Sequence, residues 1–200
     1  MDGGNRYERA FVAWLRFHQL PYLSVDESQR RVVNRQLLKS PDFLVYDRRG
    51  RGYVVDVKGR RYPGGSQTQP RRVWERWCTR QDPTSLLAWG QLLRARSVLV
   101  FVYHLRGRAA VETAQDWCDA WTWQGEAYAV CGIFAEPYIQ HMRLRSPRWD
   151  TVSLSSEVFR QLAQPVSVIF GLRGSHEPVP SGSVYSVAGR AFPDSGKTPA

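Results

Sequence analysis

Two β-rich runs around a polar, glycine-containing turn constrain the fold of this chain most strongly. The segment SPDFLVYDRRGRGYVVDVKGRR, residues 40–61, predicts two strands joined at RRGRG. Facing residues of an antiparallel hairpin have sequence numbers with a constant sum, so pairing Asp42 with Asp56 centres the hairpin on Arg49. In that register the two aspartates face each other, with Cβ atoms roughly 4.5–5.5 Å apart. The hairpin therefore brings two carboxylates together.

The second run carries two charges inside an apolar strand. Because alternate side chains point to opposite faces of a sheet, Asp56 and Lys58 share one face. Lys58 then stands about 7 Å along the strand from Asp56. Opposed carboxylates such as Asp42 and Asp56 destabilise a sheet unless a positive charge lies between them. Mg²⁺ suits such a site because it takes hard oxygen ligands, commonly one or two carboxylates, and completes its shell with water and phosphate oxygens.

A third acid lies in a predicted N-terminal helix. Residues 6–18 place apolar side chains at helical spacing, which predicts an amphipathic helix ending before Pro21. Glu8 shares a face of this helix with Phe11 and Leu15, so it is expected to project toward the protein body. There it would complete the shell of a cation or assist proton transfer.

Each of these acids also has a purely structural interpretation. Asp42 follows a proline, as is common at turns and strand starts, and an exposed ion pair of Asp56 with Lys58 contributes little stability. Glu8 is a favourable helix-start carboxylate because of the helix dipole. The apolar run from Tyr53 to Val57 argues for function, since charges within a central strand are costly without partners.

The ordered combination of Glu8, Pro41-Asp42 and Asp56-Val57-Lys58 resembles the PD-(D/E)XK nuclease superfamily, which includes Holliday-junction resolvases and many restriction endonucleases. The resemblance implies an α/β fold with a mixed central β-sheet flanked by helices, in the restriction-endonuclease-like arrangement. It also implies a nuclease that hydrolyses phosphodiester bonds in DNA with Mg²⁺ (or Mn²⁺). By position, the resemblance assigns Lys58 as the catalytic lysine, Asp42, Asp56 and the Val57 carbonyl as metal ligands, and Glu8 as a supporting acid and further ligand.

A narrower resemblance is to the uncharacterised HYExAFE family. It rests on Arg6-Tyr7-Glu8-Arg9-Ala10-Phe11, on the DVKGR strand and on RSPRWDTVSL at residues 145–154. Arg6 replaces the signature histidine and Val12 its last glutamate, while Glu8 is retained. This likeness identifies relatives and implies no measured activity.

Charge indicates the class of partner. The formal net charge of +10 and the isoelectric point near 10.0 favour a polyanion, with nucleic acid first and an anionic membrane second. Most basic residues are arginines, which reflects either phosphate recognition or a GC-rich genome. Residues 59–81 predict a mobile basic loop that either grips phosphates and stacks bases or is solvated around a packed tryptophan pair. Its candidate nucleic-acid-binding residues are Arg60, Arg61, Arg71 and Arg72, interleaved with Tyr62, Trp74 and Trp77.

The length of 200 residues predicts one domain, which we place at 1–170. Asp82 and Pro83 predict the N-cap and first-turn proline of a helix to about Arg96, followed by a buried strand to Leu105. Residues 107–125 show no clean period. Further strands are expected at 128–134 and 150–154, and a helix capped by Ser155 or Ser156 near the end of the domain. Residues 171–200 predict a disordered C-terminal tail.

Other features bound the setting. Three cysteines match no zinc or disulfide pattern, and the sequence shows no signal peptide or bilayer-length apolar run, so a soluble cytoplasmic protein with no membrane partner is expected. A homodimer is one expected arrangement, by analogy with nucleases that cut two strands. Two other functions stay open: a non-catalytic nucleic-acid-binding protein on the same fold, and a basic protein-interaction scaffold. The sequence leaves the form of the nucleic-acid substrate undetermined.

Overall fold

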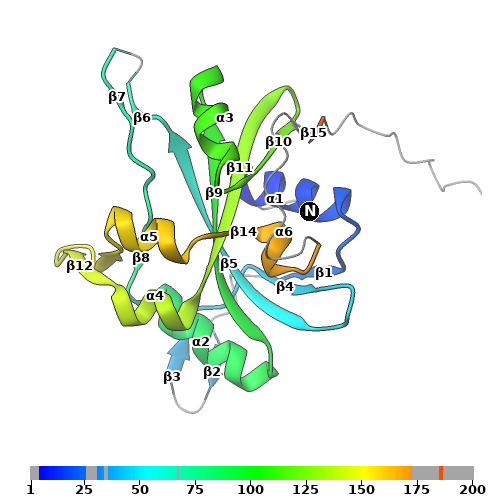
Figure 1. The fold of residues 1–200 in the computed structure, drawn as a ribbon. Helices are drawn as coiled ribbons and strands as arrows, with labels where there is room; N and C mark the ends of the chain where they lie inside the picture. Colours follow the sequence, from blue (N-terminus) through cyan, green and yellow to red (C-terminus); the bar gives the residue numbers. More distant parts are fainter. Residues whose placement is uncertain (1–4, 26–30, 34–35, 67, 173–184, 187–200) are drawn as a thin grey trace, which may run out of the picture.

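A mixed β-sheet forms the centre of the fold (Figure 1). The computed structural model describes residues 5–25, 31–33, 36–66, 68–172 and 185–186. Strands β5 and β9 run parallel at the middle of the sheet, and antiparallel neighbours extend it on both sides. In sheet order the strands are β1 (Tyr22–Ser24), β4 (Phe43–Tyr46), β5 (Gly52–Tyr62), β9 (Arg96–Leu105), β11 (Glu126–Phe134), β10 (Asp119–Trp123) and β15 (Tyr185–Ser186), with β14 (Gln164–Pro165) also on β11.

Helices cover both faces of this sheet, so the predicted α/β class with a mixed central sheet flanked by helices is confirmed (Figure 1). The helices are α1 (Arg6–Phe17), α2 (Gln81–Leu93), α3 (Arg108–Gln115), α4 (Ala135–His141), α5 (Ser156–Leu162) and α6 (Val166–Ile169). Helices α1 and α6 pack on one face, and α2, α3, α4 and α5 pack on the other. None of the described helices combines the length and apolar character needed to cross a bilayer.

Smaller sheets project from this body. One consists of β12 (Arg143–Ser146), β13 (Thr151–Ser153) and β8 (Trp77–Thr79), and two hairpins are formed by β2 (Arg31–Val33) with β3 (Gln36–Leu38) and by β6 (Gly64–Gly65) with β7 (Pro70–Arg71). Residues 108–115 and 119–123, which show no clean sequence period, form α3 and β10.

Alternation along β5 contributes side chains to two separate hydrophobic cores, one on each face of the sheet. Tyr53, Val55 and Val57 face α1, whereas Val54 faces the layer of α2, α4 and α5. Because side chains alternate along a strand, Asp56 belongs to the α2 face together with Val54. The strand therefore supplies apolar contacts to one layer and charged groups to the other.

The first helix matches its prediction closely. The side chain of Asn5 accepts hydrogen bonds from the backbone N–H groups of Tyr7 and Glu8, which caps α1, and the helix ends at Phe17. Burial is concentrated on the predicted face, at Ala10, Phe11, Trp14 and Leu15. Hydrophobic period and capping chemistry together determine this helix.

The predicted basic loop at residues 59–81 is wrong in part. Residues 59–62 continue β5, paired with β9 from Gly59 opposite Val102 to Tyr62 opposite Leu105. Strand β9, which is long and apolar, continues its pairing with β5 through these residues despite their glycine and arginine content. Trp74 is buried and stacks on Tyr62 at 3.6 Å between ring centroids, as the alternative interpretation of a packed tryptophan expected.

The predicted N-cap at Asp82 is also wrong. Helix α2 begins at Gln81, so Asp82 lies in the first turn, and the capping position at Arg80 makes no side-chain cap bond. The carboxylate of Asp82 instead enters an ion-pair network with two lysines. Ser155 caps α5 through the N–H of Val158, as predicted.

The tail predicted at 171–200 lies mostly outside the described residues. Gly171 and Leu172 are part of the body, where Leu172 packs against the core on the α1 face. Tyr185 and Ser186 form a short strand paired with β10, which differs from the disorder expected at those two positions.

A close contact between α1 and β5 gives a stability prediction. A Cβ atom at Gly59 would lie 2.1 Å from Cδ2 of the Tyr7 ring, so Gly59→Ala forces α1 away from the sheet and is expected to destabilise the fold by about 1–3 kcal/mol. Urea denaturation measures this change. The control is Gly64→Ala, whose nearest neighbour lies at 3.7 Å; equal stability of the two variants would contradict the packing argument.

Candidate functional site

The hairpin of β4 and β5 has the predicted register. Phe43 pairs with Val55 and Tyr46 pairs with Gly52, which is the constant sum that the sequence predicts for the hairpin. Asp42 lies just before β4, and its backbone N–H donates to the carbonyl of Val55 at 2.9 Å. The predicted register is therefore confirmed from Phe43 to Tyr46, whereas at Asp42 the backbone bonds to Val55, one residue before Asp56.

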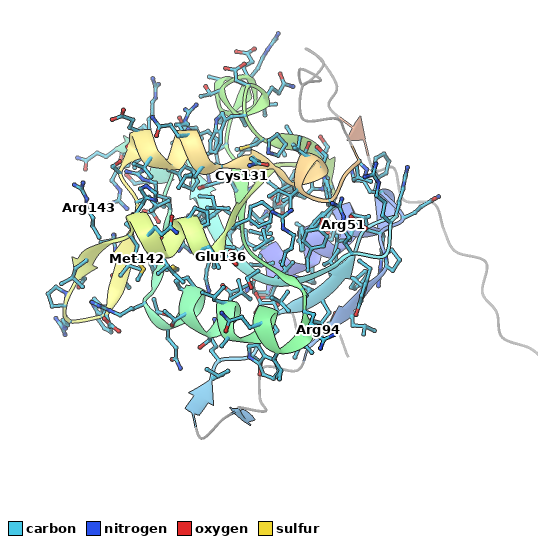
Figure 2. All side chains as sticks on the ribbon, turned by 60° about the horizontal axis from the view of Figure 1, so that its bottom comes forward. Arg51, Arg94, Cys131, Glu136, Met142 and Arg143 are labelled. Atoms are coloured by element: carbon cyan, nitrogen blue, oxygen red, sulfur yellow. The ribbon has the colours of Figure 1, made fainter. Side chains whose placement is uncertain are left out.

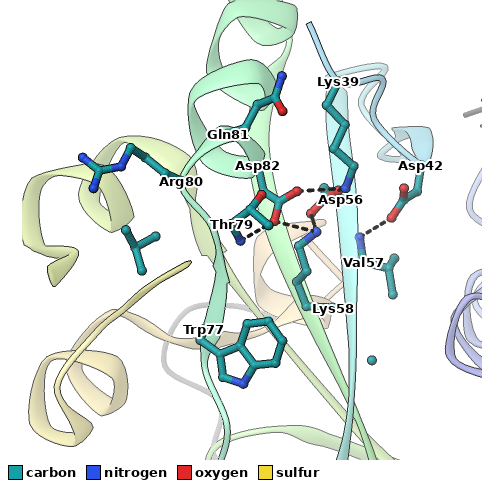
Figure 3. Close-up of polar contacts among 12 residues, drawn as sticks. Lys39, Asp42, Asp56, Val57, Lys58, Trp77, Thr79, Arg80, Gln81 and Asp82 are labelled. Carbon is teal, nitrogen blue, oxygen red and sulfur yellow. Dashed lines mark hydrogen bonds and ion pairs between the residues drawn. The ribbon is translucent and has the colours of Figure 1, made fainter. Parts of the chain in front are cut away.

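The carboxylate of Asp42 completes the edge of β5 where β4 begins. Its Oδ2 accepts the N–H of Val57 at 2.5 Å (Figure 3), and its side chain is 6% exposed. In an extended strand the N–H and C=O of one residue point to the same edge, so the Val57 carbonyl points to the side on which Asp42 lies. Two types of oxygen donor thus meet at this edge of β5.

Asp56 belongs to an ion-pair network with Lys39, Lys58 and Asp82, which we call the charge quartet (Figure 3). The ammonium of Lys39 lies 3.1 Å from Asp56 Oδ1 and 2.8 Å from Asp82 Oδ1. The ammonium of Lys58 lies 2.5 Å from Asp56 Oδ2 and 3.1 Å from Asp82 Oδ2. Asp56 is 2% exposed and Asp82 is 5% exposed. Each of the two ammonium groups therefore contacts both buried carboxylates, and the two positive charges balance the two negative charges.

Burial and ion pairing act in opposite directions on these groups. Burial by itself raises the pKa of Asp82, but the ammonium groups of Lys58 and Lys39 outweigh it and hold that pKa below its ordinary value. Burial lowers the pKa of Lys39, and the carboxylates of Asp56 and Asp82 outweigh it and raise that pKa. Lys39 and Asp82 therefore carry their charges at neutral pH.

Different elements position the members of the quartet. Lys39 follows β3, where its N–H donates to Ser85 Oγ at 3.2 Å and its carbonyl accepts from the Trp89 indole at 3.0 Å, both on α2. Asp82 accepts the N–H of Thr79 at 2.7 Å. Helix α2 thus anchors both the half-buried Lys39 and the second carboxylate.

Lys39 and Asp82 are the members that sequence reasoning missed. Only three lysines occur in the chain, and Lys39 and Lys58 are two of them, which is a weak compositional signal. Asp82 matched a helix N-cap equally well. Their meeting depends on the packing of α2 against β5, which no local pattern encodes.

Glu8 lies outside the quartet. Its Oε2 accepts the N–H of Asn5 at 3.3 Å and its other oxygen pairs with the Asn5 amide, which completes a capping box. Neighbouring contacts place α1 on the other face of the sheet from Asp56, with Tyr7 over Gly59 and Phe11 packed at 5.7 Å against Phe43. Glu8 is half-buried on that face.

The four arginines predicted to bind nucleic acid are divided by the structure. Arg60 is held internally: it donates to the carbonyls of Gly59 and Trp77, and its guanidinium lies 4.0 Å from the Trp77 ring centroid. Arg61, Arg71 and Arg72 are exposed, and Arg71 pairs with Glu75 at 3.6 Å. Three of the four arginines are accessible to a polyanion.

The donor set fits a hard divalent cation. Across the described parts of the chain, no three acidic, histidine or cysteine side chains form one cluster suited to a metal. The carboxylates of Asp42 and Asp56 and the Val57 carbonyl are nevertheless hard oxygen donors on or beside β5, and Mg²⁺ commonly takes only one or two carboxylates. Asp56 already contacts two cationic groups, so this position favours positive charge.

Comparisons with known proteins give structural likenesses and no sequence match. No protein-family model matches the chain, and its sequence matches none of the curated proteins. Among solved structures, a Holliday junction resolvase from the archaeal hyperthermophile Archaeoglobus fulgidus is similar, with a TM-score of 0.48 and 11% identity over 84% of this chain and 100% of the resolvase chain. The HYExAFE likeness therefore rests on its sequence motifs alone.

The quartet yields a prediction about stability. Lys58→Met leaves two buried carboxylates with one ammonium and is expected to lower the free energy of unfolding by about 3 kcal/mol. Lys39→Met is expected to have a smaller effect, because the Lys39 side chain is 35% exposed against 11% for Lys58. Urea denaturation at neutral pH measures both. A larger loss for Lys39→Met would refute this ranking.

Proposed function

We propose that this protein is a metal-dependent nuclease of the PD-(D/E)XK kind that hydrolyses phosphodiester bonds in DNA. The observation that carries the proposal is the arrangement around β5. Asp42, just before β4, contacts the N–H of Val57 through its carboxylate, and Val57 lies between Asp56 and Lys58, whose side chains contact each other. An ion pair of Asp56 with Lys58 that served only the fold would not need a second acid, Asp42, at the start of the neighbouring strand.

The residues that would hold Mg²⁺ or Mn²⁺ are Asp42, Asp56 and the Val57 carbonyl, with Glu8 as a supporting acid. When bound, such an ion polarises a phosphoryl oxygen and lowers the pKa of its bound water. Lys58, next to Asp56, places a fixed positive charge where negative charge develops on the phosphate. Because its side chain is only 11% exposed, water screens this charge weakly.

Lys39 has a distinct role in the proposal. Its ammonium neutralises part of the charge of Asp56, yet its side chain is 35% exposed. Contacts of its backbone with Ser85 and Trp89 hold the residue in place independently of that ion pair. A cation approaching Asp56 therefore competes with Lys39 more easily than with Lys58. Lys39 would keep the buried carboxylates compensated until that cation arrives.

Cleavage tests the proposed activity. Purified protein is expected to cut DNA with Mg²⁺ or Mn²⁺ and to stop when EDTA removes the metal. Asp56→Asn is expected to reduce cutting by roughly a thousandfold, because a metal ion supplies several kcal/mol of transition-state stabilisation. Cutting is followed on labelled single-stranded, duplex and junction DNA, because the geometry of the site does not choose among them.

The control for this experiment is Asp116→Asn, which makes the same chemical change at an exposed aspartate after α3. It should cut as the natural protein does. Undiminished cutting by Asp56→Asn, or by the natural protein in EDTA, would contradict the proposal and indicate a contaminating nuclease.

Metal affinity tests the role of Lys39 without relying on activity. Lys39→Met is expected to bind Mn²⁺ roughly fivefold more tightly, since removing a partly exposed competing ammonium corresponds to about 1 kcal/mol. Isothermal titration calorimetry and the electron paramagnetic resonance signal of free Mn²⁺ both report this change. Weaker or unchanged Mn²⁺ binding would exclude competition by Lys39.

A non-catalytic nucleic-acid-binding protein is the second candidate, and the charge quartet is the observation that favours it. Its two aspartates and two lysines neutralise one another without any ion, so the network is able to serve the fold alone. This candidate predicts DNA binding with no Mn²⁺ site at Asp56. The proposed homodimer, checked by analytical ultracentrifugation, is compatible with either function.

A further inference from the structure

A hairpin rich in arginine projects from the body beside the charge quartet. It consists of β12, a turn and β13, residues 143–153, and we call it the basic hairpin. Arg143, Arg145 and Arg148 on it are exposed, and Figure 2 shows Arg143 at the outer edge of the molecule beyond α4. Trp149 at its turn is 67% exposed, and the Arg148 guanidinium lies 5.1 Å from the Trp149 ring centroid.

The basic hairpin is attached to the segment that leads into the quartet. Strand β13 pairs with β8, with Thr151 opposite Thr79. The turn is held by Arg80, which donates through its side chain to Asp150 Oδ1 at 3.0 Å and through its backbone N–H to the Asp150 carbonyl at 2.9 Å. Asp82 follows Arg80 by two residues, and Figure 3 shows this segment running past Lys58. The exposed tryptophan and the candidate active site therefore flank one short stretch of chain.

A hollow lies between the basic hairpin and residues 64–77 and extends the surface of the hairpin. It has a volume of about 190 Å³, and Arg71, Arg76, Arg145 and Trp77 are among its lining residues. The Trp77 ring is already covered, with the guanidiniums of Arg60 and Arg145 at 4.0 and 4.9 Å from its centroid. Trp149 also has one arginine near its ring, but at 67% exposure it is more accessible to a ligand than the half-buried Trp77.

We propose that the basic hairpin binds an unpaired strand of nucleic acid, with its arginines on phosphates and Trp149 stacked on a base. Exposed aromatic rings beside arginines suit single strands because every base has a π-face, whereas paired bases are not available for stacking. The one acid of the hairpin, Asp150, is paired with Arg80, and Glu75 in the hollow is paired with Arg60 and Arg71, so the surface offers mainly positive charge. This inference rests on the proposed function for its ligand, and it narrows the substrate to DNA with a single-stranded part next to the cut.

Binding is measured by fluorescence anisotropy with a labelled oligothymidylate of about 20 nucleotides, in EDTA so that no cutting occurs. Trp149→Ala is expected to weaken binding about tenfold, and to change binding of a fully paired duplex of the same length much less. Circular dichroism at rising temperature checks that the exposed substitution leaves the fold intact.

Salt dependence tests the arginines. Replacing Arg143, Arg145 and Arg148 together by alanine is expected to reduce the slope of log affinity against log salt by about 2 for the oligothymidylate. The control replaces Arg48, Arg49 and Arg108, exposed arginines on the β4–β5 turn and on α3, and removes the same charge. The control should leave the slope unchanged.

Several results would overturn the inference. The first is that Trp149→Ala binds the oligothymidylate as tightly as the natural protein does. The second is that Trp149→Ala loses as much affinity for the duplex as for the oligothymidylate. The third is that the control variant changes the salt slope as much as the triple variant of the basic hairpin does. Because binding is measured without metal, its outcome is separate from the outcome of the cleavage experiment. A natural protein that never cuts but whose binding depends on Trp149 would refute the nuclease and retain the hairpin as a strand-binding surface.

Discussion

The buried carboxylate of Asp56 on the central strand is the constraint on which the site depends. A charge at 2% exposure is costly unless groups of opposite charge surround it, and here Lys39 and Lys58 do so together with a second buried acid, Asp82. Apolar side chains in the same places would fill the space without this desolvation cost.

The sheet distributes the candidate groups over three regions around β5. Asp56 and Lys58 face α2, Asp42 occupies the edge where β4 begins, and Glu8 lies on the face of α1. A cation with several water ligands tolerates donors from such different directions better than a cage of protein ligands alone would require.

The charge of the protein has an internal and an external part. Arg60, Lys39 and Lys58 are committed to contacts within the fold, whereas the arginines of the basic hairpin are exposed. Strand β8 and Arg80 join these two parts, because β8 pairs with the basic hairpin and Arg80 lies two residues before Asp82. Net charge alone predicts a polyanionic partner and does not distinguish the internal charges from the exposed ones.

The sequence by itself determined the β4–β5 register, the helix of residues 6–17 and the sharing of one face by Asp56 and Lys58. Turn chemistry, capping and periods of two and 3.6 residues specify these features over short stretches of chain. Only the tertiary structure decided that Lys39 and Asp82 join Asp56, that residues 59–62 extend β5, and that residues 143–153 lie beside β8. Those contacts are set by the packing of α2 and by pairing between distant strands, where the free energy depends on the whole core and no local pattern records the partner.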